Sequence, residues 1–279
     1  MQKKAFVLLS GGVDSTTCLY KAIFDFFPDD PGIQLAYGDP DIIKQALQDP
    51  DVEKDIPWVE AISVDYGQRH KKELEYARST CRRLGIRHHI LDIGNLLGGK
   101  TVMLSGDSVG EVDIPDIDYA DIKGVSPTYV PFRNGTLLSA ITAQAQKYVN
   151  EQIQEACQYN LESKDVATVL AKDLCGVYFG AHAEDAHNWA YPDCTPEFIG
   201  AMANAIYVGT YFCVRLHTPL MWLKKKDIVL LGDSLGVDFS LTWSCYAGEK
   251  QHCGTCPTCR SRKQAFIDAV VRDPTEYAA

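Results

Sequence analysis

The sequence predicts an α/β protein with a parallel sheet covered by helices on both faces, followed by a small metal-binding element. Short apolar runs alternate with segments of helical periodicity, a Gly-Gly turn joins the first run to the first helical segment, and four cysteines crowd into residues 245–259. Strands that alternate with helices form parallel sheets through right-handed crossovers. We therefore expect an α/β domain over residues 1–240, and a metal-binding element with a C-terminal helix over residues 241–279.

Each expected element has its own local signal. Short runs rich in Val, Ile and Leu mark the strands, and longer segments with one apolar face mark the helices. Gly85 ends one of these helices, since glycine suits the left-handed turn that closes a helix. In chain order, the expected strands are residues 4–9, 58–64, 86–91, 177–181 and 213–216, and the expected helices are residues 14–27, 71–84, 133–149, 196–208, 225–235 and 257–271.

Two segments interrupt the alternation. Residues 28–57 hold five of the 13 prolines and many acidic residues, which predicts a surface insertion with one short helix near residues 40–48. Residues from about 150 to 172 show only weak helical periodicity. We expect both segments to be insertions into the α/β domain.

Composition and charge narrow the class of function. No apolar run approaches the roughly 18 residues of a membrane span, and the run at residues 5–9 is too short for the core of a signal peptide. We therefore expect a cytoplasmic protein without a membrane partner.

The formal net charge is −10, and no basic run offsets it locally. Because nonspecific nucleic-acid binding needs clustered Lys and Arg, a small-molecule substrate fits better than direct nucleic-acid binding.

The most specific motif lies where the first strand turns into the first helix. It reads Ser10-Gly11-Gly12-Val13-Asp14-Ser15. The glycines allow a tight turn in which successive N–H groups converge at the positive end of a helix, and the serines add hydroxyl donors. Such a turn suits phosphate. The alternative is an ordinary strand-to-helix turn in which Asp or Ser caps the helix.

This motif resembles the PP-loop of ATP pyrophosphatases, Ser-Gly-Gly-x-Asp-Ser. It lacks the Lys of the common kinase loop and the glycine spacing of dinucleotide-binding loops. The resemblance implies an adenine nucleotide α-hydrolase-like fold in which residues 10–15 bind the β- and γ-phosphates of ATP. It also implies nucleophilic attack on the α-phosphate, with Asp14 positioning Mg²⁺ on the pyrophosphate.

The cysteine cluster predicts a metal site. Cys245, Cys253, Cys256 and Cys259 supply four thiols, whereas the other six of the ten cysteines are dispersed. Four thiolates at such spacing suit a structural, tetrahedral Zn²⁺. An iron–sulfur cluster is the chemical alternative. His252 lies beside one of the cysteines and is a possible substitute ligand.

Four further segments make the resemblance more specific. They are Asp65-Tyr66-Gly67-Gln68-Arg69-His70, Val130-Pro131-Phe132-Arg133-Asn134, Tyr191-Pro192-Asp193-Cys194 and Thr218-Pro219-Leu220-Met221-Trp222. With the PP-loop and the cysteine cluster, they resemble the 7-cyano-7-deazaguanine synthases of the queuosine pathway. The resemblance covers nearly the whole chain apart from the two expected insertions. All four segments follow predicted strand ends or open a helix, which places them at the ligand-binding edge of a parallel sheet.

The resemblance and the chemistry of the segments together give a set of candidate residues. Arg133 opens a helix, where its guanidinium can clamp a phosphate or a carboxylate, and Lys225 matches a lysine of the family that offsets developing phosphate charge. Asp193 is the expected acceptor for the N–H groups of a guanine-like ring. The catalytic candidates are Asp14, Arg133 and Lys225; the ATP-binding candidates are residues 10–15 and Asp65; and the substrate-binding candidates are Tyr66, Gln68, Arg69, Asn134, Asp185, Tyr191, Asp193 and Thr218.

Several of these residues have other interpretations. Tyr66 can equally pack the turn, Arg133 can lie free on the surface, and Asp193 can be a turn former. Cys194 is a possible nucleophile, although ammonia reacts with adenylates unaided. A cluster of His182, Glu184, Asp185 and His187 suggests a second metal site, but we prefer a role in substrate binding or in the loop.

The resemblance also implies a reaction. The carboxylate of 7-carboxy-7-deazaguanine attacks the α-phosphate of ATP, ammonia displaces AMP, and a second adenylation of the amide leads to the nitrile. A homodimer is implied as well. Three alternatives remain. One is a divergent ligase that stops at the amide or transfers the acyl group to another amine, such as one on a protein partner. The others are a tRNA-modifying enzyme and a non-catalytic nucleotide sensor. The expected insertions leave the divergent ligase open for the final step, and the charge of −10 disfavours the tRNA enzyme.

Overall fold

The computed structural model describes residues 1–27, 40–49, 51–52, 54–68, 71–97, 124–158, 163–247 and 250–278. Five parallel strands form one sheet in the order β3-β2-β1-β4-β5. The strands are β1 (Lys4–Leu8), β2 (Val59–Asp65), β3 (Arg87–Asp92), β4 (Cys175–Tyr178) and β5 (Val214–His217). The predicted parallel sheet is confirmed, and the sequence located each strand to within a few residues.

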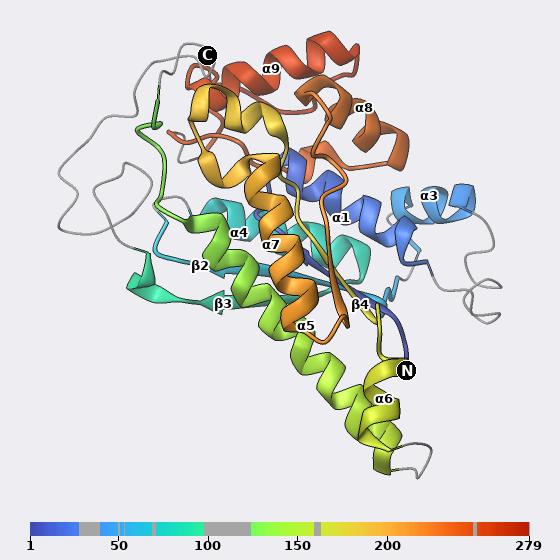
Figure 1. Ribbon diagram of the computed structural model, residues 1–279. Coiled ribbons are helices and arrows are strands. Elements are labelled where there is room, and N and C mark those ends of the chain that lie inside the picture. Colours follow the sequence, from blue (N-terminus) through green and yellow to red (C-terminus); the bar gives the residue numbers. More distant parts are fainter. Residues whose placement is uncertain are drawn as a thin grey trace.

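Helices cover both faces of the sheet (Figure 1). One face carries α1 (Val13–Asp25), α3 (Pro40–Gln48), α4 (Lys72–Leu84), α8 (Lys225–Leu235) and α9 (Pro257–Ala269). The other face carries α5 (Arg133–Gln158), α6 (Lys164–Leu170) and α7 (Pro196–Gly209). Short 3-10 helices lie at Gly94–Leu96, Ala183–Trp189, Pro192–Cys194 and Phe239–Leu241. Of the helices in the described ranges, none has the length and apolar character needed to span a membrane.

The alternation along β1 shows how the sheet divides the core. Ala5 and Val7 belong to the apolar cluster under α1, whereas Phe6 and Leu8 belong to the cluster under α5. Successive side chains of a strand point to opposite faces. Because both faces are buried, the strand reads as an uninterrupted apolar run, which is why the sequence revealed it.

The two expected insertions are partly regular. The short helix predicted near residues 40–48 is α3, and its Ile43 and Leu47 are buried in the main core. This helix is therefore anchored in the domain, while residues 28–39 lie outside the described part of the chain. In the second segment, α5 continues to Gln158, beyond the predicted end at residue 149, and α6 follows after a gap.

The C-terminal element joins the same core. Ala265, Phe266 and Ala269 of α9 pack with residues of β1 and α1, and Phe266 lies edge-on against Phe239 at a ring distance of 4.9 Å. Arg262, only 2% exposed, binds Asp273 and the backbone carbonyls of Phe239 and Thr242. Residues 241–278 are thus fastened to the α/β domain by apolar packing and by a buried ion pair.

Candidate functional site

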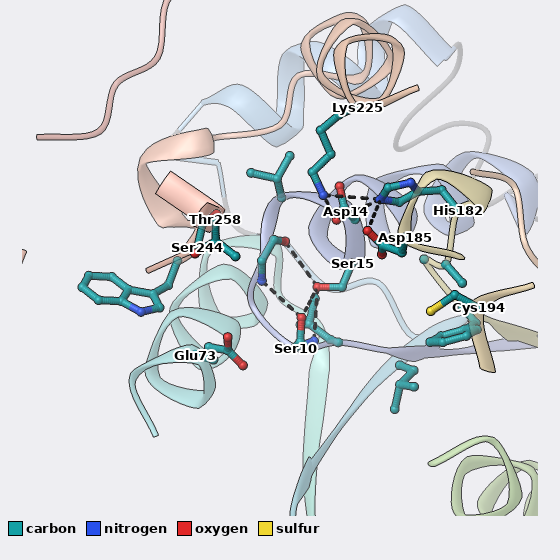
Figure 2. A pocket seen from close by; sticks show the side chains of 18 of the residues that line it. Ser10, Asp14, Ser15, Glu73, His182, Asp185, Cys194, Lys225, Ser244 and Thr258 are labelled. Atoms are coloured by element: carbon teal, nitrogen blue, oxygen red, sulfur yellow. Dashed lines mark hydrogen bonds and ion pairs between the residues drawn. The ribbon is translucent and has the colours of Figure 1, made fainter. Parts of the chain in front are cut away.

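A cavity of about 590 Å³ opens at the carboxyl ends of β1, β2 and β4. Its walls come from the loop after β1, the first turns of α4, α5 and α8, the segment after β4, and the C-terminal element (Figure 2). Ligand sites of open α/β folds lie at this edge of the sheet. The volume is in the usual range for pockets that hold a cofactor or substrate, roughly 300 to 1,000 Å³.

The loop of residues 10–15 forms part of the cavity wall. The Oγ atoms of Ser10 and Ser15 lie 3.0 Å apart, and the N–H of Ser10 donates to Ser15 Oγ at 3.2 Å. Gly12 is the N-cap residue of α1 and has no side chain with which to cap its first turn. The ordinary turn with a side-chain cap, considered as an alternative, is therefore not formed. The first residues of the helix line the cavity, so that their N–H groups are available to an anionic ligand.

Gly11 sets the shape of this loop. Its φ of +91° lies in the left-handed region that favours glycine. A Cβ atom at Gly11 would lie 2.2 Å from the carbonyl oxygen of Glu73 in α4, a contact that backbone atoms cannot relieve by rotating. The carbonyl of Gly11 in turn accepts the N–H of Trp243 at 2.8 Å. The loop is thus held between α4 and the C-terminal element.

One end of the cavity holds a cluster of charges around Lys225. Its ammonium pairs with the carboxylate of Asp14, and its Nζ lies 3.4 Å from Nε2 of His182 (Figure 2). The same Nε2 is 3.7 Å from Asp14 Oδ2 and 3.4 Å from Asp185 Oδ1. Glu184 accepts the backbone N–H of Lys225 at 2.8 Å. The sequence predicted Asp14 and Lys225 from separate motifs 211 residues apart, and the fold brings them into contact.

Burial and charge act in opposite directions on these groups. Burial raises the pKa of Asp14, but Lys225 and His182 outweigh it and hold the pKa well below its usual value. Burial lowers the pKa of Lys225, but Asp14 and then Asp185 outweigh it, so the pKa is raised. Both groups are therefore charged at neutral pH, which suits a site that binds anionic phosphates and a cation.

Two buried polar atoms of this cluster are left without a hydrogen bond. Among the described residues, Oδ1 of Asp14 and Nδ1 of His182 have no partner. Buried polar atoms are normally satisfied, so these two are candidates for contact with a ligand. The second metal site considered for His182, Glu184, Asp185 and His187 does not assemble, because within the described ranges only the four cysteines bring three or more ligand atoms together.

Another part of the cavity wall is built around Arg133 at the start of α5. Burial lowers the pKa of Arg133, but its polar neighbours outweigh this effect, so the pKa is raised above its usual value. These neighbours are Tyr66, and then Cys194, Tyr246 and Asp193. Its Nε donates to Oδ1 of Asn134 at 3.2 Å. Arg133 is therefore a charged side chain in the cavity wall, as predicted, and not a free surface arginine.

Asn134 and Asp193 bind each other. The backbone N–H of Asn134 donates to Asp193 Oδ2 at 2.9 Å, and its amide donates to the carbonyl of Asp193 at 3.2 Å and to Cys194 Sγ at 3.2 Å. Both residues are buried. Asp193 thus satisfies a free N–H at the start of α5, and Asn134 lines the cavity beside it.

Other predicted residues have partners of their own. Asp65 accepts the N–H of Gly67 at 3.1 Å and pairs with Lys71 at 3.0 Å. Gln68 is buried and closes its own turn, accepting the N–H of Tyr66 at 2.9 Å. Tyr66 and Gln68 line the cavity, as do Asp185 and the loop residues 10, 12, 13, 14 and 15; the described cavity walls do not include Asp65, Tyr191, Asp193 or Thr218. Arg69 lies outside the described residues.

Glu73 and Trp243 are among the cavity residues that sequence reasoning missed. Glu73, in the first turn of α4, lines it near Ser10 (Figure 2). Trp243 lines it from the C-terminal element and is 1% exposed. An acidic residue in a first helical turn and a tryptophan near a cysteine cluster are common features, and neither identifies a site without the fold.

The four cysteines form a compact cluster. Their Sγ atoms all lie within 4.8 Å of one another, with Cys245 to Cys256 at 3.9 Å and Cys253 to Cys259 at 4.0 Å. Four sulfurs bound to one tetrahedral ion at about 2.3 Å would lie about 3.8 Å apart. The cluster therefore fits a single ion. His252, considered as a possible substitute ligand, accepts the N–H of Ser244 at 3.1 Å.

Comparisons with known proteins match this architecture. The family model of queuosine biosynthesis protein QueC matches residues 52–164 and 158–270, and an asparagine synthase model matches residues 2–96. A 7-cyano-7-deazaguanine synthase of Caldicellulosiruptor bescii is 36% identical over 98% of this chain and 97% of its own length. The synthase of Pseudoalteromonas atlantica is 33% identical over 99% of this chain and all of its own length.

These relatives, which are named as synthases, are about as long as this chain. The segments 28–57 and 150–172 therefore do not make this chain longer than they are. Among solved structures, a U34-tRNA thiolase of Methanococcus maripaludis is similar over 96% of this chain and 65% of its own at 16% identity and a TM-score of 0.40, too low to carry an argument. The near-complete matches at 33 to 36% identity assign the family. The chain belongs to the QueC family of 7-cyano-7-deazaguanine synthases.

Proposed function

We propose that this protein is an ATP-dependent C–N ligase that converts 7-carboxy-7-deazaguanine and ammonia into 7-cyano-7-deazaguanine. The observation that carries the proposal is the loop of residues 10–15, which lines the cavity at the uncapped start of α1, beside the paired Asp14 and Lys225. This arrangement suits a triphosphate. Membership in a family whose relatives are named for this product supports the choice of acid.

ATP binds with its β- and γ-phosphates on the loop. Lys225 offsets the charge that develops when the pyrophosphate leaves, because a fixed ammonium in a partly enclosed site stabilises such charge better than water does. Asp14, with one oxygen free of protein partners among the described residues, would hold a Mg²⁺ that screens the phosphates. Asp65 also remains a proposed ATP contact, although its carboxylate is paired with Lys71.

The first chemical step joins the acid to AMP. A carboxylate oxygen bonds to the α-phosphorus, and the bond from that phosphorus to the leaving pyrophosphate breaks. Arg133, charged and facing the cavity, is positioned to bind the carboxylate or the α-phosphate, with Asn134 beside it. The protein contributes orientation and charge stabilisation, and no covalent enzyme intermediate is required.

Two further steps give the nitrile. Ammonia bonds to the acyl carbon, the bond to AMP breaks, and a proton leaves, which produces the amide. The amide oxygen then bonds to the α-phosphorus of a second ATP, and the bond from that phosphorus to the leaving pyrophosphate breaks. Loss of two N–H protons and cleavage of the C–O bond yield the nitrile and a second AMP. Burial raises the pKa of the Cys194 thiol, so a thiolate nucleophile is disfavoured at this position.

The remaining proposed contacts and cofactors follow from this chemistry. The substrate-binding residues are proposed to be Tyr66, Gln68, Arg69, Asn134, Asp185, Tyr191, Asp193 and Thr218. Zn²⁺ is the proposed ion of the cysteine cluster, in a structural role, because four thiolates leave no open coordination position. We also propose a cytoplasmic homodimer. The alternative that ends at the amide, or that transfers the acyl group to an amine of a protein partner, uses the same first step.

The test is a reaction with defined components. The protein is incubated with ATP, Mg²⁺, ammonium and 7-carboxy-7-deazaguanine, and mass spectrometry follows the acid, the amide and the nitrile while chromatography follows the nucleotides. We expect two AMP for each nitrile, and no AMP when the acid is left out. Formation of ADP would exclude attack at the α-phosphorus. Accumulation of amide without nitrile would favour the divergent ligase.

A further inference from the structure

The cavity contains four carboxylates, and three of them are engaged. Asp14 pairs with Lys225, Glu184 accepts the N–H of Lys225, and Asp185 faces His182. Glu73 is the fourth. Within the described part of the chain it is the one cavity carboxylate for which no side-chain hydrogen bond or ion pair is formed, although it lines the cavity beside the loop (Figure 2). A carboxylate in this position is available to a ligand.

The backbone of Glu73 is fixed while its side chain is free to bind. The residue lies in the first turn of α4, and its carbonyl packs against Gly11, so the helix cannot move without moving the loop. Burial raises the pKa of Glu73 to about 7, and the charge of Arg133 only partly opposes this. A carboxylate that lacks donors in a half-buried site gains most from a ligand that supplies N–H groups.

The acid proposed as substrate supplies such groups. Its ring has the guanine arrangement, in which N1–H and the 2-amino group point the same way. Two adjacent donors match the two oxygens of one carboxylate. The other acidic candidate for this contact, Asp193, already accepts the N–H of Asn134 and lies outside the described cavity walls.

We propose that the carboxylate of Glu73 accepts hydrogen bonds from N1–H and the 2-amino group of the deazaguanine acid, and so selects guanine-like rings. This inference rests on the proposed function. Arg133, whose charge acts on Glu73 across the cavity, is then available to the carboxylate of the substrate. The two side chains would hold the two polar ends of one flat molecule.

The experiment compares two substrates in three proteins. The substrates are 7-carboxy-7-deazaguanine and its analogue in which hydrogen replaces the 2-amino group. The proteins are the wild type, Glu73→Gln and Glu75→Gln. Glu75 lies in the same first turn but is exposed, so its variant is the matched control for charge and helix stability. Steady-state assays measure kcat/KM for each acid and KM for ATP.

We expect the wild type to prefer the substrate with the amino group by about 10- to 100-fold, since a charged hydrogen bond is lost with the analogue. Glu73→Gln should reduce kcat/KM for the full substrate by a similar factor and leave KM for ATP unchanged. Its preference between the two acids should shrink to within about threefold. Glu75→Gln should behave as the wild type in all three respects.

Three outcomes would overturn the assignment. In the first, the wild type processes both acids equally, a result that needs no variant and so does not depend on whether Glu73→Gln folds. In the second, Glu73→Gln keeps the full preference between the acids. In the third, Glu73→Gln keeps its KM for the acid and slows only the ammonia-dependent step, which would make Glu73 a proton acceptor. If the wild type forms no AMP with the full substrate, the proposed function itself fails.

Discussion

Replacing Gly11 with alanine tests whether the nucleotide loop is held in one shape by its neighbours. At φ = +91° an alanine is strained by about 1 to 2 kcal/mol. Its Cβ would also lie 2.2 Å from the carbonyl oxygen of Glu73 and 3.0 Å from the backbone nitrogen of Ala77. Because both contacts are with backbone atoms of α4, the loop has to move away from the helix by about 1 Å to reach ordinary contact distances.

That movement should break a further contact. The carbonyl of Gly11 accepts the N–H of Trp243, and losing this bond costs about 1 kcal/mol. We therefore expect Gly11→Ala to lower the free energy of unfolding by about 2 to 4 kcal/mol. ATP affinity should fall by about 100-fold, because a displacement of about 1 Å in a preorganised site costs about that factor.

Gly12→Ala is the matched control for stability. At φ = −80° alanine is unstrained, and its Cβ would meet Ser10 Oγ at 3.5 Å and the Trp243 carbonyl at 3.6 Å, both ordinary contacts. Urea unfolding followed by circular dichroism compares the two variants, and calorimetric titration measures ATP binding by Gly11→Ala. Equal unfolding midpoints for the two variants, or ATP affinity within threefold of wild type in Gly11→Ala, would refute the reasoning. Since Gly12 lines the cavity, its variant is a control for unfolding only.

Three further predictions use other parts of the structure. Lys225→Met should lower kcat by about 100- to 1,000-fold, because the developing phosphate charge loses its counter-charge. Lys226 is exposed on the same helix, so Lys226→Met should leave kcat unchanged, and an equal loss of kcat in the two variants would contradict this. Burial raises the pKa of Glu60, but the bond to Lys4 outweighs this effect, so the pKa is lowered in the folded protein. The ion pair therefore stabilises the fold fully above about pH 4.5, and this stabilisation is lost as the pH falls through the pKa of the folded state. Glu60→Gln should therefore lower the unfolding free energy by about 3 kcal/mol at pH 7, with a smaller difference below pH 4.5, and a pH-independent difference in urea titrations would oppose this. Chelation of the proposed Zn²⁺ should abolish ATP binding before the helical circular dichroism signal of the α/β domain is lost. Simultaneous loss of ATP binding and of that signal would contradict this order of events.

Much of the fold could be predicted because burial on both faces leaves a simple signal. Both β1 and β2 are buried along almost their whole length, and each was located from the sequence although β2 contains Glu60 and Ser63. The prediction for β4 was shifted: residues 177–181 were expected, but the strand is Cys175–Tyr178. Cys175 and Gly176 carry little strand propensity, and their pairing with β1 and β5 sets the register. The apolar residues that follow Tyr178 instead leave the sheet and line the cavity.

The site was predictable where its residues are contiguous. The loop and the four cysteines are linear motifs, and both assemble as expected. Asp193 shows why the rest was harder, because an acidic residue in a loop has the same sequence signature whether it binds a substrate or satisfies a helix N-terminus. Glu73 shows the converse. Its only local signal is that of an ordinary first helical turn, and its availability follows from three other carboxylates finding partners in distant elements.

The structure also gives a physical reason for a cysteine cluster beside the loop of residues 10–15. A Gly-Gly turn is flexible by itself, yet an anion-binding loop works only if its N–H groups are already oriented when the ligand arrives. Here α4 limits the loop on one side through the carbonyl of Glu73, and Trp243 holds it on the other through its N–H. Trp243 is itself fixed by its indole bond to the carbonyl of Cys245 and by its packing against His252. An ion that draws the four thiols together would therefore act at a distance on the phosphate site, since it holds the segment that keeps Gly11 in place.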